Sequence, residues 1–149
     1  MTRRTARLKL PVLLAAALAC AAACAGTPEE NEHVSCTATL SAPSFRRGDT
    51  AAIRVVLTPA RGIHLNGSPL PSLRLDPGSV VLARGGAEAA VGVQGYLESD
   101  VVQHITIRKD APRGKHVLRG TVTYYYCSDT EGWCMRYQQA LVLNLTITR

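Results

Sequence analysis

Apolar and polar residues alternate with a period of two in four stretches of the second and later thirds of the chain. The alternation covers residues 53–57, 101–107, 118–126 and 141–147, and Leu141, Leu143, Leu145 and Ile147 form the clearest apolar face. In the stretch 101–107, Gln103 interrupts the apolar face. Period-two alternation is typical of half-buried antiparallel strands.

Turn-forming residues separate these stretches, as in the segments Arg47-Gly48-Asp49, Asp76-Pro77-Gly78, Gly85-Gly86 and Ala111-Pro112-Arg113-Gly114. After the first 24 residues, no stretch of about ten residues repeats with the period of a helix. Seven to eight short strands in one domain predict an all-β fold, an immunoglobulin-like antiparallel β-sandwich over residues 34–149.

The first 24 residues have the order of a secretory signal peptide, with basic residues followed by an apolar run over residues 10–23. Cleavage before Cys24 would leave a lipidated cysteine, as in a lipoprotein, and cleavage before Gly26 would leave an ordinary secreted chain. We favour the lipoprotein interpretation. Residues 25–33 are polar and acidic and resemble a tether.

This segment also accounts for most of the net positive charge. The chain of 149 residues has 17 Lys and Arg against 11 Asp and Glu, a net charge of +6. Four of the basic residues lie in the first nine positions, and removing them leaves 13 basic residues against 11 acidic ones. A domain so near neutrality lacks the basic surface that a nucleic acid requires, so we expect no nucleic-acid partner. We expect a protein exported to the periplasm or cell envelope, attached to the membrane through a lipid anchor only, or otherwise secreted.

Three cysteines, Cys36, Cys127 and Cys134, follow the signal region. An oxidising compartment favours a disulfide between Cys127 and Cys134, which would close a hairpin loop and leave Cys36 as a small buried apolar residue. The chain-entropy model gives about 2–3 kcal/mol for so short a loop and about 4–5 kcal/mol for a loop of ~90 residues. A purely structural role would therefore favour a bond from Cys36 to Cys127.

Aromatic residues gather around the later pair of cysteines. Five of the seven aromatic residues, Tyr124, Tyr125, Tyr126, Trp133 and Tyr137, lie within 14 positions. They could shield a reactive sulfur or bind a partner. Alternatively the tyrosines at alternate positions are core residues and Trp133 caps the sandwich. Spacing alone leaves both a structural disulfide and a redox-active one open.

Three motifs stand out in the last third of the chain: Ala111-Pro112-Arg113-Gly114, Thr121-Val122-Thr123-Tyr124, and Cys127-Ser128-Asp129 with Gly132-Trp133-Cys134. In these motifs, and from Gly62 to Ile147 as a whole, the chain resembles the N-terminal periplasmic domain of the thiol:disulfide interchange protein DsbD, in the disulfide bond corrector family. The resemblance implies an immunoglobulin-like sandwich whose cysteine pair passes electrons to envelope proteins, without a cofactor. It implies that Cys134 forms the mixed disulfide with a partner and that Cys127 resolves it. The neighbouring or partner-binding residues would be Tyr124, Tyr126, Asp129 and Trp133.

The sequence also departs from that family. Six residues separate the cysteines where the family has five, and Met135-Arg136 replaces a Pro-Pro pair. The stretch that matches the protective cap loop, 85–95, has no aromatic residue before Tyr96. The electron-supplying domains of DsbD have no counterpart here, so we expect a separate reductant protein.

The charges near the pair predict a thiol that is not strongly activated. Asp129 and Glu131 disfavour a thiolate and Arg136 favours one, while His64 could approach only through the fold. We therefore expect exchange to be fast only when a partner has docked.

A copper site made by Cys127, Cys134, Met135 and a histidine is a weaker alternative. None of the four histidines, His33, His64, His104 and His116, has a recognisable metal-binding spacing to the cysteines, so we assign no metal ligand. An immunoglobulin-like envelope module with a structural disulfide is the other alternative.

Overall fold

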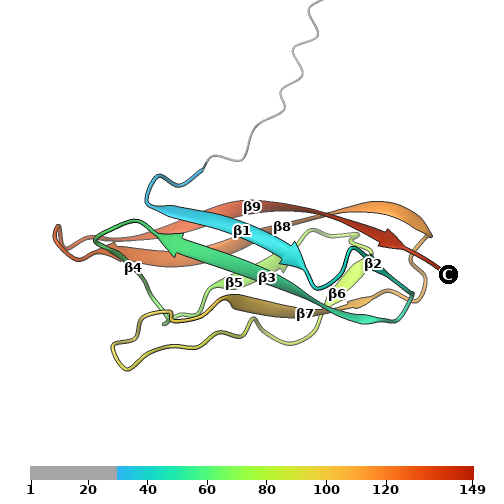
Figure 1. Ribbon diagram of the computed structural model, residues 1–149, viewed down its shortest axis with the longest axis horizontal. Coiled ribbons are helices and arrows are strands. Elements are labelled where there is room, and N and C mark those ends of the chain that lie inside the picture. The colour runs from blue at the N-terminus through green and yellow to red at the C-terminus, as the bar shows by residue number, and fades with distance from the viewer. Residues whose placement is uncertain (1–29) are drawn as a thin grey trace, which may run out of the picture.

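The computed structural model describes residues 30–149 and contains nine strands in two layers (Figure 1). Their bounds are β1 Val34–Leu40, β2 Ser44–Phe45, β3 Thr50–Pro59, β4 Ile63–Leu65, β5 Ser72–Leu75, β6 Val81–Ala83, β7 Val101–Ile107, β8 Gly114–Ser128 and β9 Cys134–Ile147. No helix lies within residues 30–149, and so none there is long and apolar enough to cross a membrane. The expected signal peptide, the lipidation site Cys24 and the tether before residue 30 lie outside the described residues.

The order of the strands is that of an immunoglobulin-like sandwich. One sheet has the order β1-β3-β7-β6 and the other the order β2-β9-β8-β4, with β5 also paired to β8. The first, second, fifth and fourth strands of an immunoglobulin domain form one sheet, and the third, sixth and seventh form the other. The chain matches this pattern when β4 and β5 together are taken as the third strand and β2 as an additional edge strand beside β9. The expected all-β sandwich is therefore confirmed.

The structure has more strands than the seven to eight that the sequence predicted. One of them, β2, is a two-residue strand parallel to β9. Another arises because the third strand is broken: β4 pairs with β8 at residues 126–128, and β5 pairs with β8 at residues 120–123. Residues 67–71 leave the sheet between these two pairings and form a loop.

The core lies between the sheets and consists of the apolar faces that the alternation predicted. Its fully buried members include Ile53, Val55, Val101, Ile105, Ile107, Val122, Tyr124 and Ile147. Gln103 is buried among them with 2% of its surface exposed, and its Nε2 donates hydrogen bonds to the carbonyls of Arg84, Gly85 and His104. A buried amide with partners of this kind carries little penalty, which explains how a glutamine interrupts an apolar face.

The longest feature of the fold is the hairpin of β8 and β9, which pair without interruption from Gly114–Ile147 to Cys127–Cys134. Successive side chains of a strand point to opposite faces of the sheet. In β8 the even-numbered residues Leu118, Val122, Tyr124 and Tyr126 face the core. The odd-numbered residues, among them Tyr125 and Cys127, therefore lie on the outer face.

Gly120 lets β5 approach β8 closely, and this contact predicts a sharp effect of substitution. A Cβ at Gly120 would lie 2.7 Å from the Arg74 carbonyl oxygen of β5, which is backbone and cannot move aside cheaply. We expect Gly120→Ala to lower the free energy of unfolding by about 1–3 kcal/mol in urea denaturation.

Gly86→Ala is the matched control, because a Cβ there has no neighbour within 4 Å. It should change stability by less than about 0.5 kcal/mol. Equal effects of the two substitutions would contradict the close approach of β5 to β8.

Candidate functional site

A disulfide joins Cys127 at the end of β8 to Cys134 at the start of β9. The two residues are direct partners in the hairpin, and their Cα atoms are 4.0 Å apart. Cys36 is a free cysteine, so the pairing of Cys127 with Cys134 is confirmed and the alternative pairing of Cys36 with Cys127 is wrong. The residues of the bond come from two strands that already pair with each other.

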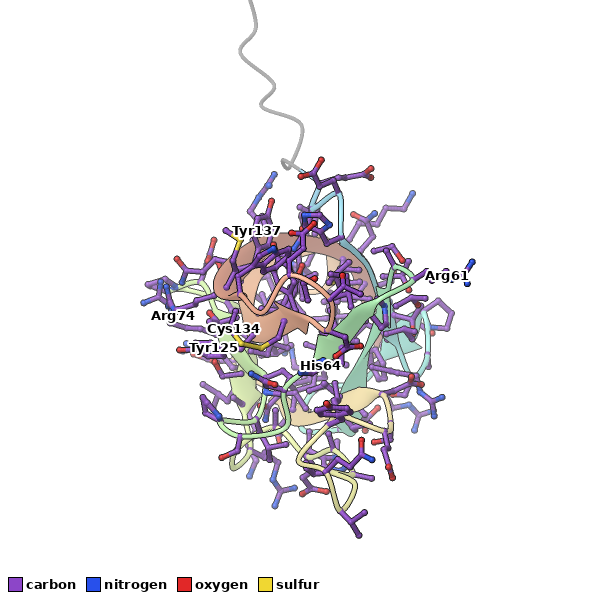
Figure 2. The ribbon with its side chains drawn as sticks, turned by 90° about the vertical axis from the view of Figure 1, so that its left-hand side faces the viewer. Arg61, His64, Arg74, Tyr125, Cys134 and Tyr137 are labelled. Atoms are coloured by element: carbon purple, nitrogen blue, oxygen red, sulfur yellow. A yellow bond between two sulfur atoms is a disulfide. The ribbon has the colours of Figure 1, made fainter. Side chains whose placement is uncertain are left out.

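The disulfide lies on the outer face of its sheet, away from the core. This follows from the alternation in β8, since its neighbour Tyr126 faces the core and is 2% exposed. Figure 2 shows Cys134 on the same side of the molecule as Tyr125 and Arg74. The two sulfur-bearing residues differ in access, because Cys127 is 5% exposed whereas Cys134 is exposed.

The third strand supplies the groups that cover Cys127. His64 of β4 is its direct strand partner, and Asn66 follows two residues later on the same face. The Asn66 side chain donates a hydrogen bond from Nδ2 to Cys127 Sγ over 3.3 Å. The sequence analysis missed Asn66, because only the register of β4 on β8 reveals it.

His64 does reach the cysteine pair through the fold. Its Nδ1 lies 2.5 Å from Asp129 Oδ1, and its ring stacks on Tyr96 with centroids 3.9 Å apart. The His64 side chain is 18% exposed and that of Asp129 is 50% exposed. The loop before β7 thus brings one aromatic ring, Tyr96, next to the cysteine-bearing strand.

The two acidic residues of the hairpin loop have other partners than the sulfurs. Asp129 contacts His64, and Glu131 accepts a hydrogen bond from the indole Nε1 of Trp133. Arg136 is exposed and is the strand partner of Tyr125 on the outer face. The two carboxylates that were expected to oppose a thiolate therefore interact with His64 and Trp133 instead of with the cysteines.

Tyr124 and Tyr126 are core residues, which agrees with the alternative interpretation of these alternate tyrosines and not with the partner-binding position that the resemblance implied. They are 0% and 2% exposed and lie inside the sandwich, where burial raises the pKa of Tyr124 to about 12. The Tyr124 hydroxyl accepts a hydrogen bond from Asn31 over 3.1 Å. Because these side chains face the core, neither is available for contact with a partner, and Tyr125 is the tyrosine on the cysteine face.

Trp133 caps one end of the sandwich. Its ring packs edge-on against Tyr126 with centroids 5.8 Å apart, and against His33 at 5.3 Å. It is half-buried and packs against the core. Of the proposed neighbours, Asp129 therefore lies beside the covering residues of Cys127, whereas Trp133 lies on the core side.

Of the four histidines, His64 alone is a strand partner of a disulfide cysteine. His33 lies against Trp133, His64 against Asp129, and His116 bonds to the Pro112 carbonyl through Nε2. His104 is on β7 in the other sheet. Among residues 30–149 no three His, Cys, Asp or Glu side chains form a group that could hold a metal ion.

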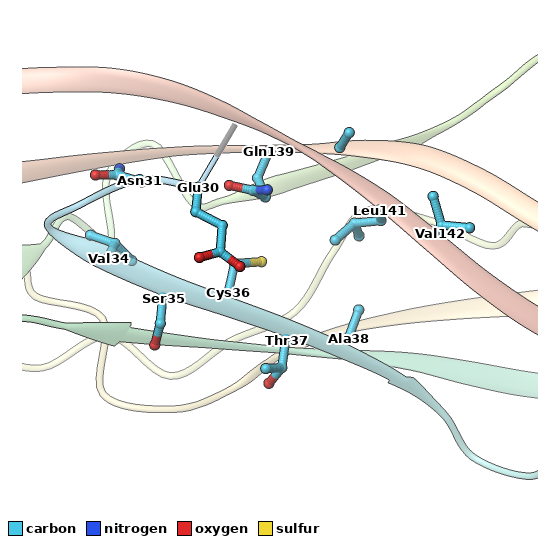
Figure 3. A pocket seen from close by; sticks show the side chains of 11 residues that line it. Glu30, Asn31, Val34, Ser35, Cys36, Thr37, Ala38, Gln139, Leu141 and Val142 are labelled. Atoms are coloured by element: carbon cyan, nitrogen blue, oxygen red, sulfur yellow. The ribbon is translucent and has the colours of Figure 1, made fainter. Parts of the chain in front are cut away.

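A large cavity of about 760 Å³ forms a groove between β1 and β9 (Figure 3). Neither cysteine of the disulfide lines it, so size alone does not identify the chemistry of this protein. Cys36 lies in this groove, half-buried, and burial raises the pKa of its thiol to about 11. A smaller cavity of about 270 Å³, lined by His64 and Tyr96 among others, lies beside the covering residues of Cys127.

Comparisons with known proteins give no family for the chain. No family model matches it, and no curated protein matches its sequence. Among solved structures, murine CRIg superposes with a TM-score of 0.44 at 15% sequence identity, over 78% of this chain and 99% of that one. The chain's own strand order and contacts identify its fold.

The burial of Cys36 predicts a slow and strongly pH-dependent thiol. The thiolate is the reactive species, and a pKa of about 11 leaves only a minute thiolate fraction at neutral pH. In the oxidised protein, the rate of Cys36 alkylation by iodoacetamide should rise about tenfold per pH unit up to about pH 11. A rate that levels off near pH 8 would contradict the burial of this thiol.

Proposed function

We propose that this chain is an extracytoplasmic thiol–disulfide exchange domain, which passes electrons through Cys127 and Cys134 to a partner protein. It is an immunoglobulin-like sandwich with one disulfide between these residues. The proposal draws on the resemblance of residues 62–147 to the N-terminal domain of DsbD and on the place of the disulfide in the fold.

The observation that carries the proposal is the position of the bond. In antibody domains the disulfide joins the two sheets through the core, whereas this one lies outside the core and joins neighbouring strands. Closing so short a loop contributes about 2–3 kcal/mol in the chain-entropy model. This disulfide contributes little to stability, and it joins one exposed cysteine to one covered cysteine. These features suit thiol–disulfide exchange better than a purely structural role.

The difference in access between the two cysteines supports a separate role for each. A partner thiolate reaches Cys134 Sγ, forms a mixed disulfide there, and releases Cys127 as a thiolate when the internal S–S bond breaks. A second partner thiol then attacks the partner sulfur of the mixed disulfide and frees Cys134. Two electrons enter the domain, and the partner leaves as a disulfide.

The same steps in reverse carry electrons outward. The Cys134 thiolate attacks a partner disulfide, and Cys127 resolves the mixed disulfide by attacking Cys134 Sγ. The covered position of Cys127 keeps it from competing for the partner. This chain would need a separate reductant protein, and it requires no cofactor for the exchange itself.

We further propose that this exchange takes place in the periplasm or cell envelope. The signal-like first 24 residues and a lipidated Cys24 would keep the domain near the membrane surface. Protein thiols and disulfides of that compartment are the expected partners. Tyr125 and Arg136 lie beside the pair on the outer face and are the first candidates for partner contact.

Trapping of mixed disulfides tests the assignment. With Cys127→Ser the resolving thiol is lost, so Cys134 should accumulate covalent adducts with envelope proteins on non-reducing gels. Cys134→Ser should give few adducts, because Cys127 is covered. Both variants should carry Cys36→Ser, so that the free thiol adds no adducts of its own.

Abundant adducts through Cys127 alone would reverse the two roles. An absence of adducts from either variant, in cells that make the protein at its normal level, would favour an immunoglobulin-like module with a structural disulfide.

A further inference from the structure

The Asn66 side chain is the polar group that contacts the covered sulfur. Its Nδ2 lies 3.3 Å from Cys127 Sγ, and Cys127 is 5% exposed. Cys127 is also the sulfur that leaves when Cys134 is attacked. We propose that Asn66 is a catalytic residue of the exchange, which donates a hydrogen bond to the departing Cys127 thiolate; this inference rests on the proposed function.

The amide is held in place by the backbone around it. The Asn66 N–H donates to the Tyr125 carbonyl over 2.9 Å, and the next residue, Gly67, donates to Gly95 over 2.7 Å. Leu65 accepts from Leu97 over 2.9 Å. Asn66 is therefore fixed on both sides, by β8 and by the loop before β7, so its donor is already aimed before the reaction begins.

The chemistry favours the charged form of the sulfur. A disulfide sulfur is a weak acceptor, whereas a thiolate is an anion, and hydrogen bonds to charged acceptors are roughly twice as strong as neutral ones. Burial alone raises the pKa of a thiol, because little water reaches the anion. The Asn66 donor opposes that effect and makes Cys127 a better leaving group.

The step balances within the site. As the attacking thiolate forms its bond to Cys134 Sγ, the electron pair of the breaking S–S bond passes to Cys127 Sγ. The negative charge thus moves from the attacker to Cys127, and Asn66 keeps its proton throughout. The ionisable groups near Cys127 are His64 on β4, Tyr96 stacked on it, Asp129 in the hairpin loop, and Tyr125 and Arg136 on the outer face.

Gly67 shows why this arrangement resists change. A Cβ there would lie 2.4 Å from a Val91 side-chain carbon, so the loop segments pack closely around the residue after Asn66. A substitution at Asn66 should accordingly keep the backbone in place and alter only the donor.

The pKa of Cys127 tests the inference directly. In a Cys36→Ser, Cys134→Ser background, NMR of cysteine labelled at Cβ reports the ionisation of this single thiol. Asn66→Ala should lower the acid dissociation constant of the Cys127 thiol about tenfold, which raises its pKa by about one unit. Asn66→Asp keeps the shape of the side chain and should raise the pKa of Cys127 at least as much, because an ionised carboxylate cannot donate a hydrogen bond.

Asn144→Ala is the matched control, since Asn144 is an exposed asparagine farther along β9 and should leave the pKa unchanged. Unchanged values in both Asn66 variants, with near-native stability, would overturn the inference. The isosteric aspartate variant keeps the test valid if the alanine variant folds poorly.

The rate of exchange separates this inference from the proposed function. With Cys127 and Cys134 intact, glutathione should open the disulfide several-fold more slowly in Asn66→Ala, because a leaving thiol with a higher pKa departs more slowly. If the unsubstituted protein reacts and both Asn66 variants react at the same rate, only the role of Asn66 fails. If the unsubstituted disulfide does not react in the native state, the exchange function fails, and with it the role of Asn66.

Discussion

The alternation of side chains along the β8–β9 hairpin is the constraint on which the site depends. The two strands pair from Gly114–Ile147 to Cys127–Cys134, so the facing of every residue is fixed by its position in this register. Tyr124 and Tyr126 fall on the core side, and Cys127 falls on the outer side. A shift of one residue would exchange these faces, burying the disulfide in the core and exposing the tyrosines.

The break in the third strand gives that outer face its chemistry. A continuous strand beside β8 would place every alternate side chain in a regular row on the sheet surface. Here the chain leaves the sheet after β4, and Asn66 and His64 pack around Cys127 where Tyr96 and Asp129 hold them. The result is a disulfide with one covered sulfur next to a hydrogen-bond donor and one exposed residue at the start of β9.

Local sequence patterns predict the parts of this structure that depend on neighbours in the chain. Alternation identified the core faces of β3, β7, β8 and β9, and turn residues marked the connections between them. The same alternation put Tyr124 and Tyr126 on the core face and Cys127 on the other face, and of the two interpretations of these tyrosines the core one is confirmed. Asn66 and Tyr96 reach Cys127 and His64 through pairings between distant segments, and no local pattern encodes that register.

The reduction potential of the Cys127–Cys134 bond tests the central claim most directly. The folded domain would be equilibrated in glutathione buffers, and the two oxidation states would be counted by the mass added on thiol alkylation. Exchange by an exposed disulfide outside the core predicts a potential above about −250 mV. A value below about −300 mV, typical of structural disulfides in secreted proteins, would contradict the account.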